Sequence, residues 1–161
     1  MKHAVLFSLL GALALTGPAC ADDWAVSAIK YKNKGAYDAF FGFYYKFATN
    51  GAVVGCDGKN TRKSGLSSGD DITLQLDNSD NSLVDPECLP RIGDEVWGMV
   101  YIDRGFGFSQ AMNTQSCRKD GAKFYYHPDG GTVVVQTKGT TENNNRCRIN
   151  QKGEVKYPPP E

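Results

Sequence analysis

The sequence predicts an all-β protein, a single antiparallel β-sandwich stabilised by two disulfides. Three observations lead to this prediction. Apolar and polar residues alternate with a period of two in several short stretches, and turn residues separate these stretches. No stretch keeps a helical period long enough to form βαβ units. Once an N-terminal leader is set aside, the number of cysteines is even, which is typical of exported proteins with disulfides.

The first 21 residues have the parts of a secretory signal peptide. Lys2 and His3 precede an apolar run over residues 4–15, and small residues at 19–21 end the segment. The run is shorter than the ~20 residues that a membrane-spanning helix needs. We therefore expect the mature chain to start at Asp22 and to be secreted, into a periplasm or out of the cell.

Signal removal also decides the cysteine count, because one of the five cysteines, Cys20, lies in the leader. The remaining four are Cys56, Cys88, Cys117 and Cys147, which allow three connectivities. We favour Cys56–Cys88 and Cys117–Cys147, since each pair closes a loop beside an expected strand. Acylation of Cys20 after cleavage in front of it is the alternative, although Gly17 stands where lipoprotein signals usually have Leu.

Length and charge limit the remaining choices. Residues 22–150 are enough for one domain with its own core, here the β-sandwich. Residues 151–161 end in a run of prolines after Tyr157, and we expect this tail to be extended and disordered. Loss of Lys2 leaves 17 basic residues against 18 acidic ones. A basic surface is therefore not expected, and nucleic acid is not an expected partner.

The expected strands follow one another with turn residues between them. They are residues 24–32, 36–47, 52–56, 72–76, 95–103, 123–127, 132–138 and 147–149. Residues 36–47 are the most aromatic, and the odd-numbered positions from Ala39 to Phe47 form one face. A helix is the alternative there, but Gly42 and the many aromatic residues favour a strand. The Pro-Asp-Gly-Gly sequence at 128–131 predicts a turn that joins the strands at 123–127 and 132–138 into a hairpin.

Candidate catalytic residues are few. The mature chain has a single histidine, His127, which precedes Pro128 in an expected turn. A hydrolytic triad would pair it with a serine, but neither Ser109 nor Ser116 has the Gly-x-Ser-x-Gly context of a nucleophile elbow. Enzymatic function is therefore not the favoured hypothesis, but it stays open.

Acidic residues do not form a recognisable site either. Asp94 with Glu95, and Asp70 with Asp71, could serve a glycosidase, but both pairs flank expected strands as turn formers do. The oxygen-rich loop at 77–85 could hold Ca²⁺ but lacks the EF-hand spacing. Zinc usually needs three or four His or Cys ligands, which one histidine and four paired cysteines do not supply. We expect no metal and no cofactor.

Aromatic side chains outside an obvious core are the better candidates for function. Phe106 and Phe108 alternate with glycines in an expected loop, where a contact role is natural. Tyr44 lies on the second face of the aromatic strand. Exposed aromatic residues can stack on sugars or enter a lipid surface. The alternative for the aromatic strand is that both of its faces are covered.

Two segments resemble the C-terminal membrane-recognition domain of the cholesterol-dependent cytolysins. Residues 34–43, Lys-Gly-Ala-Tyr-Asp-Ala-Phe-Phe-Gly-Phe, are similar to the opening strand Gly-Ala-Tyr-x-Ala-x-Phe of that domain. Residues 139–141, Gly-Thr-Thr, are similar to its late Gly-Thr-Thr-Leu loop. The order of the two segments fits a β-sandwich over most of the mature chain.

The resemblance implies sterol recognition by the second Thr and the Leu of that loop. Thr141 matches the Thr, but Glu142 replaces the Leu. The Trp-rich, Cys-containing loop and the pore-forming segments of the family have no counterpart. The resemblance therefore implies the sandwich more than it implies sterol binding, and it does not imply pore formation by this chain alone.

The leading hypothesis is a secreted, non-catalytic recognition module, toxin-like or virulence-associated, that binds a lipid or glycan surface. The expected contact residues are Phe106, Phe108, Thr140, Thr141 and Tyr44. The alternative is a protein partner, with the chain acting as an inhibitor of a secreted enzyme or as an effector through the disulfide-braced loop at 77–91. The third hypothesis is an enzyme that depends on His127.

Overall fold

The computed structural model describes residues 22–57, 65–77, 79, 87–103, 113–118 and 122–158, all of them in strands, turns or irregular structure. The strands are β1 (Asp22–Gly35), β2 (Ala39–Lys46), β3 (Val53–Asp57), β4 (Asp71–Gln75), β5 (Glu95–Ile102), β6 (Asn113–Ser116), β7 (Ala122–Tyr126), β8 (Gly131–Gly139), β9 (Arg148–Gln151) and β10 (Val155–Lys156). The all-β prediction is confirmed. None of the described residues belongs to a helix of the length and hydropathy that crossing a bilayer requires.

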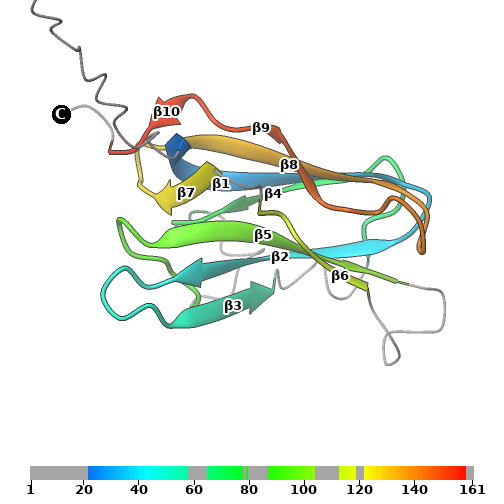
Figure 1. The fold of residues 1–161 in the computed structure, drawn as a ribbon, viewed down its shortest axis with the longest axis horizontal. Coiled ribbons are helices and arrows are strands. Elements are labelled where there is room, and N and C mark those ends of the chain that lie inside the picture. The colour runs from blue at the N-terminus through cyan, green and yellow to red at the C-terminus, as the bar shows by residue number, and fades with distance from the viewer. Residues whose placement is uncertain are drawn as a thin grey trace, which may run out of the picture.

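All ten strands belong to one hydrogen-bonded sheet, in the order β3-β2-β5-β7-β1-β8-β9. β4 and β10 also pair with β1, and β6 pairs with β5. Figure 1 shows that the sheet is folded over on itself, so that β1, β8 and β9 lie in one layer and β5, β2 and β3 in a second layer facing it. β1 is therefore the organising strand, with β4, β7, β8 and β10 as its partners.

The pairing of β1 corrects one expectation. β7 and β8 both run parallel to β1, whereas β4 and β10 run antiparallel to it. The sheet is thus mixed, and β7 and β8 do not form the expected hairpin. The reason is that the chain crosses β1 between them: His127 N–H donates to the carbonyl oxygen of Val26 (3.0 Å), and Ser27 Oγ donates to the carbonyl oxygen of Gly130 (2.7 Å).

The core lies between the two layers and uses one face of each long strand. On β2, Phe41, Phe43 and Tyr45 point inward, as the alternation predicts. Tyr31 of β1 stacks on Phe41 of β2, with 4.8 Å between ring centroids and 16° between ring planes. The other face of β2 is also largely covered, since Phe40 is only 2% exposed. Aromatic stacking thus joins the layers at their centre.

A buried asparagine fixes the loops at one end of this core. Asn33, on β1, is fully buried, and its Nδ2 donates to the carbonyl oxygens of Tyr37 and Leu66, both at 2.7 Å. Its Oδ1 accepts from the N–H of Gly35 at 2.9 Å. One side chain thereby holds the end of β1 and the turn that follows it to Leu66, 33 residues further along the chain.

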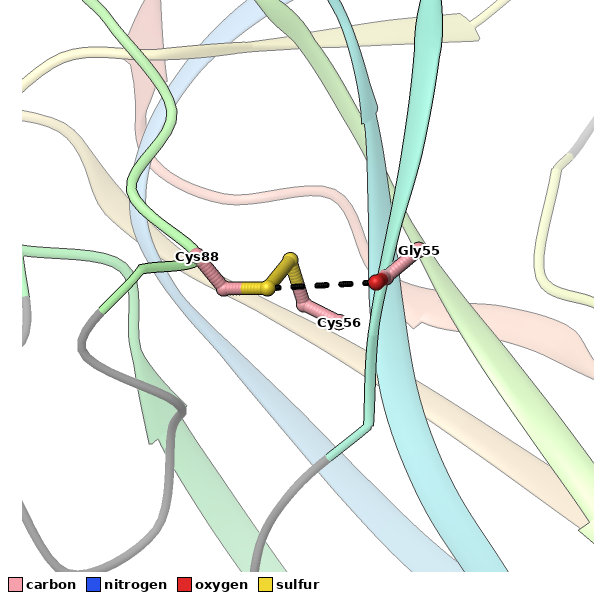
Figure 2. The surroundings of a disulfide bond; sticks show 3 residues. All are labelled: Gly55, Cys56 and Cys88. Atoms are coloured by element: carbon pink, nitrogen blue, oxygen red, sulfur yellow. Dashed lines mark hydrogen bonds between the residues drawn. A yellow bond between two sulfur atoms is a disulfide. The ribbon is translucent and has the colours of Figure 1, made fainter.

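Both expected disulfides are present, Cys56–Cys88 and Cys117–Cys147. Figure 2 shows how the first one joins β3 to the segment before β5. The Sγ of Cys88 lies 3.8 Å from the carbonyl oxygen of Gly55, which is a packing contact because a disulfide sulfur has no hydrogen to donate. The segment that carries Cys88 therefore lies beside β3.

The C-terminal residues differ from the expected disordered tail over their described part. Gln151 ends β9, and Val155 and Lys156 form β10 against Ala25 and Trp24 of β1. The ring of Tyr157 stacks on that of Tyr125, with 4.6 Å between centroids. A strand pair and an aromatic stack thus hold this segment to the domain, although its sequence is rich in proline.

Candidate functional site

Three aromatic side chains lie together on the outer face of β2 and β5. Tyr44 is opposite Trp97 across the strand pair, and their rings stack at 6.0 Å between centroids. The hydroxyls of Tyr44 and Tyr101 are 3.1 Å apart, within hydrogen-bonding distance. A Cβ at Gly55 on β3 would come within 2.8 Å of the Tyr44 ring, so glycine leaves the room that this ring occupies. We call Tyr44, Trp97 and Tyr101 the aromatic strip.

A cation covers the middle of the aromatic strip. The guanidinium carbon of Arg118 lies 3.5 Å from the centroid of the Trp97 ring, a close cation–π contact. The same guanidinium is 3.5 Å from Oε1 of Glu95. Trp97 is only 7% exposed, whereas Tyr44 and Tyr101 are half-buried. The strip is therefore closed over its tryptophan and open at its two tyrosines.

A cleft of about 310 Å³ adjoins the strip where β2 ends and β5 begins. Its lining contains two cations, one carboxylate, two aromatic rings and three small residues: Lys46, Lys123, Glu95, Phe47, Tyr125, Ala48, Gly51 and Gly93. The strand register explains this composition. Lys46 is opposite Glu95, Glu95 is opposite Tyr125, and Lys123 lies on the same side of β7 as Tyr125 because it is two residues away.

A buried carboxylate holds one wall of the cleft in place. Asp94 is buried, and its Oδ1 accepts from the N–H of Ala48 while its Oδ2 accepts from the N–H of Arg91, both at 2.9 Å. The turn before β5 is therefore tied to the end of β2. Asp94 acts as a structural turn residue, and Glu95, its neighbour, is the one that reaches the cleft.

The electrostatics of the cleft follow from burial and from nearby charges. Burial raises the pKa of the Tyr125 phenol above its ordinary value, and the neighbouring Asp23, Glu95 and Tyr157 raise it further. Tyr125 therefore stays protonated and neutral at physiological pH. Lys46 and Lys123 are exposed, and neither is in an ion pair with another residue in the described part of the chain. The cleft thus contains two amines without an ion-pair partner, a carboxylate that also contacts Arg118, and two aromatic rings.

His127 is not among the residues that line this cleft. The Nδ1 of His127 accepts from the N–H of Asp129 at 3.2 Å, which makes it part of the turn between β7 and β8. Within the described ranges, no group of three or more His, Cys, Asp or Glu side chains gathers where a metal could bind. What the cleft residues can do chemically is to bind a ligand, through charge and ring contacts.

The expected contact residues that the structure describes, Thr140, Thr141 and Tyr44, lie in two separate places. Thr140 and Thr141 lie in the loop after β8, where Thr140 Oγ1 accepts from the N–H of Asn143 (3.2 Å) and the Thr141 carbonyl accepts from Asn145 Nδ2 (2.8 Å). Figure 1 shows this loop at the opposite end of the molecule from the turn between β2 and β3. Tyr44 belongs to the aromatic strip instead. Phe106 and Phe108 lie outside the described residues.

Sequence reasoning named Glu95 as part of a carboxylate pair and missed the other residues of the cleft. Lys46 and Glu95 each lie on the outer face of an expected strand, and the alternation along each strand is enough to predict that. What the sequence does not contain is the register that sets Lys46 beside Glu95, and Glu95 beside Tyr125. Cross-strand neighbours of this kind become visible only once the strand order is known.

Comparison with known proteins gives a likeness of fold. No protein-family model matches the sequence, and no curated protein matches it. Among solved structures, a disulfide-locked mutant of intermedilysin, solved with human CD59, aligns at 13% identity and a TM-score of 0.40 over 78% of this chain and 24% of that chain. The membrane-binding domain of pneumolysin aligns at 11% identity and a TM-score of 0.38 over 80% of this chain and 96% of that one.

Listeriolysin O aligns at 12% identity and a TM-score of 0.40, over 80% of this chain and 22% of that chain. These solved structures are cholesterol-dependent cytolysins, the family that the two sequence segments resemble. The likeness is one of fold alone. The chain spans about a quarter of the length of the intermedilysin chain that it matches.

Proposed function

We propose that the protein is a secreted, non-catalytic recognition module that binds a lipid or glycan surface. The observation that carries this proposal is the cleft beside the aromatic strip, where Lys46, Lys123, Glu95, Phe47 and Tyr125 line one hollow. Free amines and a carboxylate beside aromatic rings bind polar headgroups and sugars by charge, hydrogen bonding and stacking. Two disulfides are typical of proteins that work outside the reducing cytosol, which supports secretion.

The cleft and the strip are held rigidly, which favours binding. The aromatic strip is stacked and hydrogen-bonded, and Asp94 ties the cleft wall to the end of β2. A surface that is already ordered loses little conformational entropy when a ligand binds. The loop after β8 is a second proposed contact region, with Thr140 and Thr141, together with Phe106 and Phe108.

The test is flotation of the purified protein with liposomes, with and without sterol, beside a glycan array. Binding to a vesicle or to a defined glycan class supports the proposal. Three double variants then locate the contact: K46Q/K123Q for the cleft, T140A/T141A for the loop after β8, and F106A/F108A for the expected loop phenylalanines. No binding to any vesicle or glycan, by a protein that is folded by circular dichroism, contradicts the proposal.

A protein partner is the second candidate function, and the Cys56–Cys88 disulfide favours it. This bond braces the segment after Cys88, where Leu89 is an exposed apolar side chain. A braced segment can insert into a partner at low entropic cost, as an inhibitor or effector would. Recovery of a stoichiometric protein partner that no longer binds an L89S variant would support this function.

A further inference from the structure

Exposed apolar side chains gather at the same end of the molecule as the cleft. Three large apolar residues are exposed among those that the structure describes, and two of them adjoin the cleft. Val53, 54% exposed, is opposite Lys46 in the β2–β3 pair, and Ile92, 62% exposed, precedes Gly93 in the cleft lining. Apolar side chains exposed beside a polar hollow are typical of a surface that meets another phase or a partner.

The charges in the cleft have two signs and occupy different places. Lys46 and Lys123 come from β2 and β7, and Glu95 of β5 lies between these two strands. Two amines attract a phosphate. A carboxylate beside aromatic rings attracts a quaternary ammonium group, which prefers ring faces to water. The Arg91 guanidinium, 5.6 Å from the Phe47 ring centroid, shows that this ring is already within reach of a cation.

We propose that this cleft binds the phosphocholine headgroup of a lipid bilayer, which rests on the proposed recognition function and names its ligand. Lys46 and Lys123 bind the phosphate, while Glu95 and the rings of Tyr125 and Phe47 receive the trimethylammonium group. Glu95 lies 3.5 Å from Arg118, so its carboxylate already accepts one cation, and it would repel a purely anionic headgroup. A neutral sterol would leave both lysines without a partner. The zwitterion therefore matches the lining better than either.

The bilayer is the proposed source of the headgroup because of Val53 and Ile92. Side chains of this kind enter the headgroup and acyl boundary of a membrane when a polar site beside them holds the headgroup. The docking end of the protein is then the end with the β2–β3 turn. It lies opposite the loop that contains Thr140 and Thr141, as Figure 1 shows.

The experiment is flotation with phosphatidylcholine vesicles and, separately, with phosphatidylglycerol vesicles, which lack the ammonium group. The protein should prefer phosphatidylcholine. K46Q/K123Q should lower the affinity for phosphatidylcholine by about tenfold or more, since charge-assisted hydrogen bonds are among the strong ones. The matched control is K34Q/K138Q, which removes the same charge from two exposed lysines at the opposite end and should bind as the parent does.

Two more variants separate the roles of the groups. E95Q should lose the preference for phosphatidylcholine over phosphatidylglycerol, because it removes the partner of the ammonium group. V53S/I92S should lose vesicle binding but still bind free phosphocholine in an NMR titration, which distinguishes the bilayer from the free headgroup as the source.

Three outcomes would overturn the headgroup proposal. They are equal binding by K46Q/K123Q and its control, a preference for phosphatidylglycerol, and binding to a glycan without binding to any choline-containing vesicle. In each of these cases the protein still recognises a surface, so the proposed function survives. Absence of binding to every vesicle and glycan overturns both the headgroup proposal and the proposed recognition function. The failure of the headgroup proposal alone can therefore be told apart from the failure of both.

Discussion

The backbone of Gly130 crosses directly over the backbone of Val26. A Cβ placed on Gly130 would lie 2.4 Å from the Val26 nitrogen and 2.6 Å from its Cα. The crossing takes the chain from β7 on one side of β1 to β8 on the other, and both strands run parallel to β1. Only a residue without a side chain allows two backbones to approach so closely.

The first prediction concerns this crossing. Gly130→Ala should lower the free energy of unfolding by roughly 2–4 kcal/mol, because the added methyl group meets backbone that cannot move aside. Gly69→Ala is the control, since a Cβ there has no atom within 4 Å and meets only the strain of a positive φ, which costs roughly 1–2 kcal/mol. Urea unfolding measures both. Equal losses would show that the crossing is not tightly packed.

Asn33 is the second target, because it satisfies three backbone groups from one buried position. Asn33→Ala should cost about 3 kcal/mol or more, since it leaves two carbonyls and one N–H without their partner in the interior. Asn33→Asp has the same shape but lacks the two donors and adds a charge, so it should cost at least as much. A loss below about 1 kcal/mol in urea unfolding, with water able to replace the side chain, would contradict this account.

The two disulfides provide a third, comparative prediction. Their sequence separations are 32 and 30 residues, so chain entropy alone predicts nearly equal losses, about 3–4 kcal/mol each. Cys117 and Cys147 are both buried, whereas Cys88 is half-buried. C117A/C147A should therefore cost more than C56A/C88A. Urea unfolding of the two double variants under identical conditions tests the order, and the reverse order would contradict the role of burial.

The fourth prediction is loss of stability at alkaline pH. Burial raises the pKa of Tyr31, Tyr37, Tyr45, Tyr125 and Tyr126 in the folded protein, while in the unfolded chain these phenols titrate near 10. Below pH 10 both states are protonated, so the stability is unaffected. Above it the unfolded state releases protons first, and stability should fall by about 1.4 kcal/mol per pH unit for each phenol that stays protonated in the fold.

Tyr31→Phe provides the check on this sign. It removes one titrating group, so its stability should fall less steeply between pH 10 and 11.5 than that of the parent, although it also loses the 2.7 Å hydrogen bond to Thr137. Thermal unfolding followed by circular dichroism at several pH values measures the slope. Identical slopes in the two proteins would show that Tyr31 is not protected from ionisation.

Much of the fold could be predicted because its signal is local. The alternation in β2 correctly assigns Phe41, Phe43 and Tyr45 to the core, and the cysteine positions next to strands indicate the two disulfides that are observed. β6 could not be predicted, since Asn-Thr-Gln-Ser has no apolar period, and it is a strand only because it pairs with β5. β10 follows from a pairing with β1 and a stack on Tyr125, neither of which is a local property.

The expected β7–β8 hairpin was wrong for the same reason. Its Pro-Asp-Gly-Gly turn is typical of hairpins, but the partner of both strands is β1, about a hundred residues earlier. The aromatic strip likewise has one residue that the sequence indicates and two that it does not. Tyr44 could be picked out as an aromatic residue on an outer face, whereas its neighbours Trp97 and Tyr101 belong to the site through strand order alone.

The pairing of β1 has a consequence for how the protein is made. Its partners are β4, β7, β8 and β10, and the last of them ends at Lys156. A chain that leaves the ribosome from its N-terminus therefore has its organising strand before all four partners, and three of these, β7, β8 and β10, come after residue 121. Native pairing waits for the far end of the polypeptide, as in other folds dominated by distant contacts. Until then β4 is the one partner of β1 that has been made.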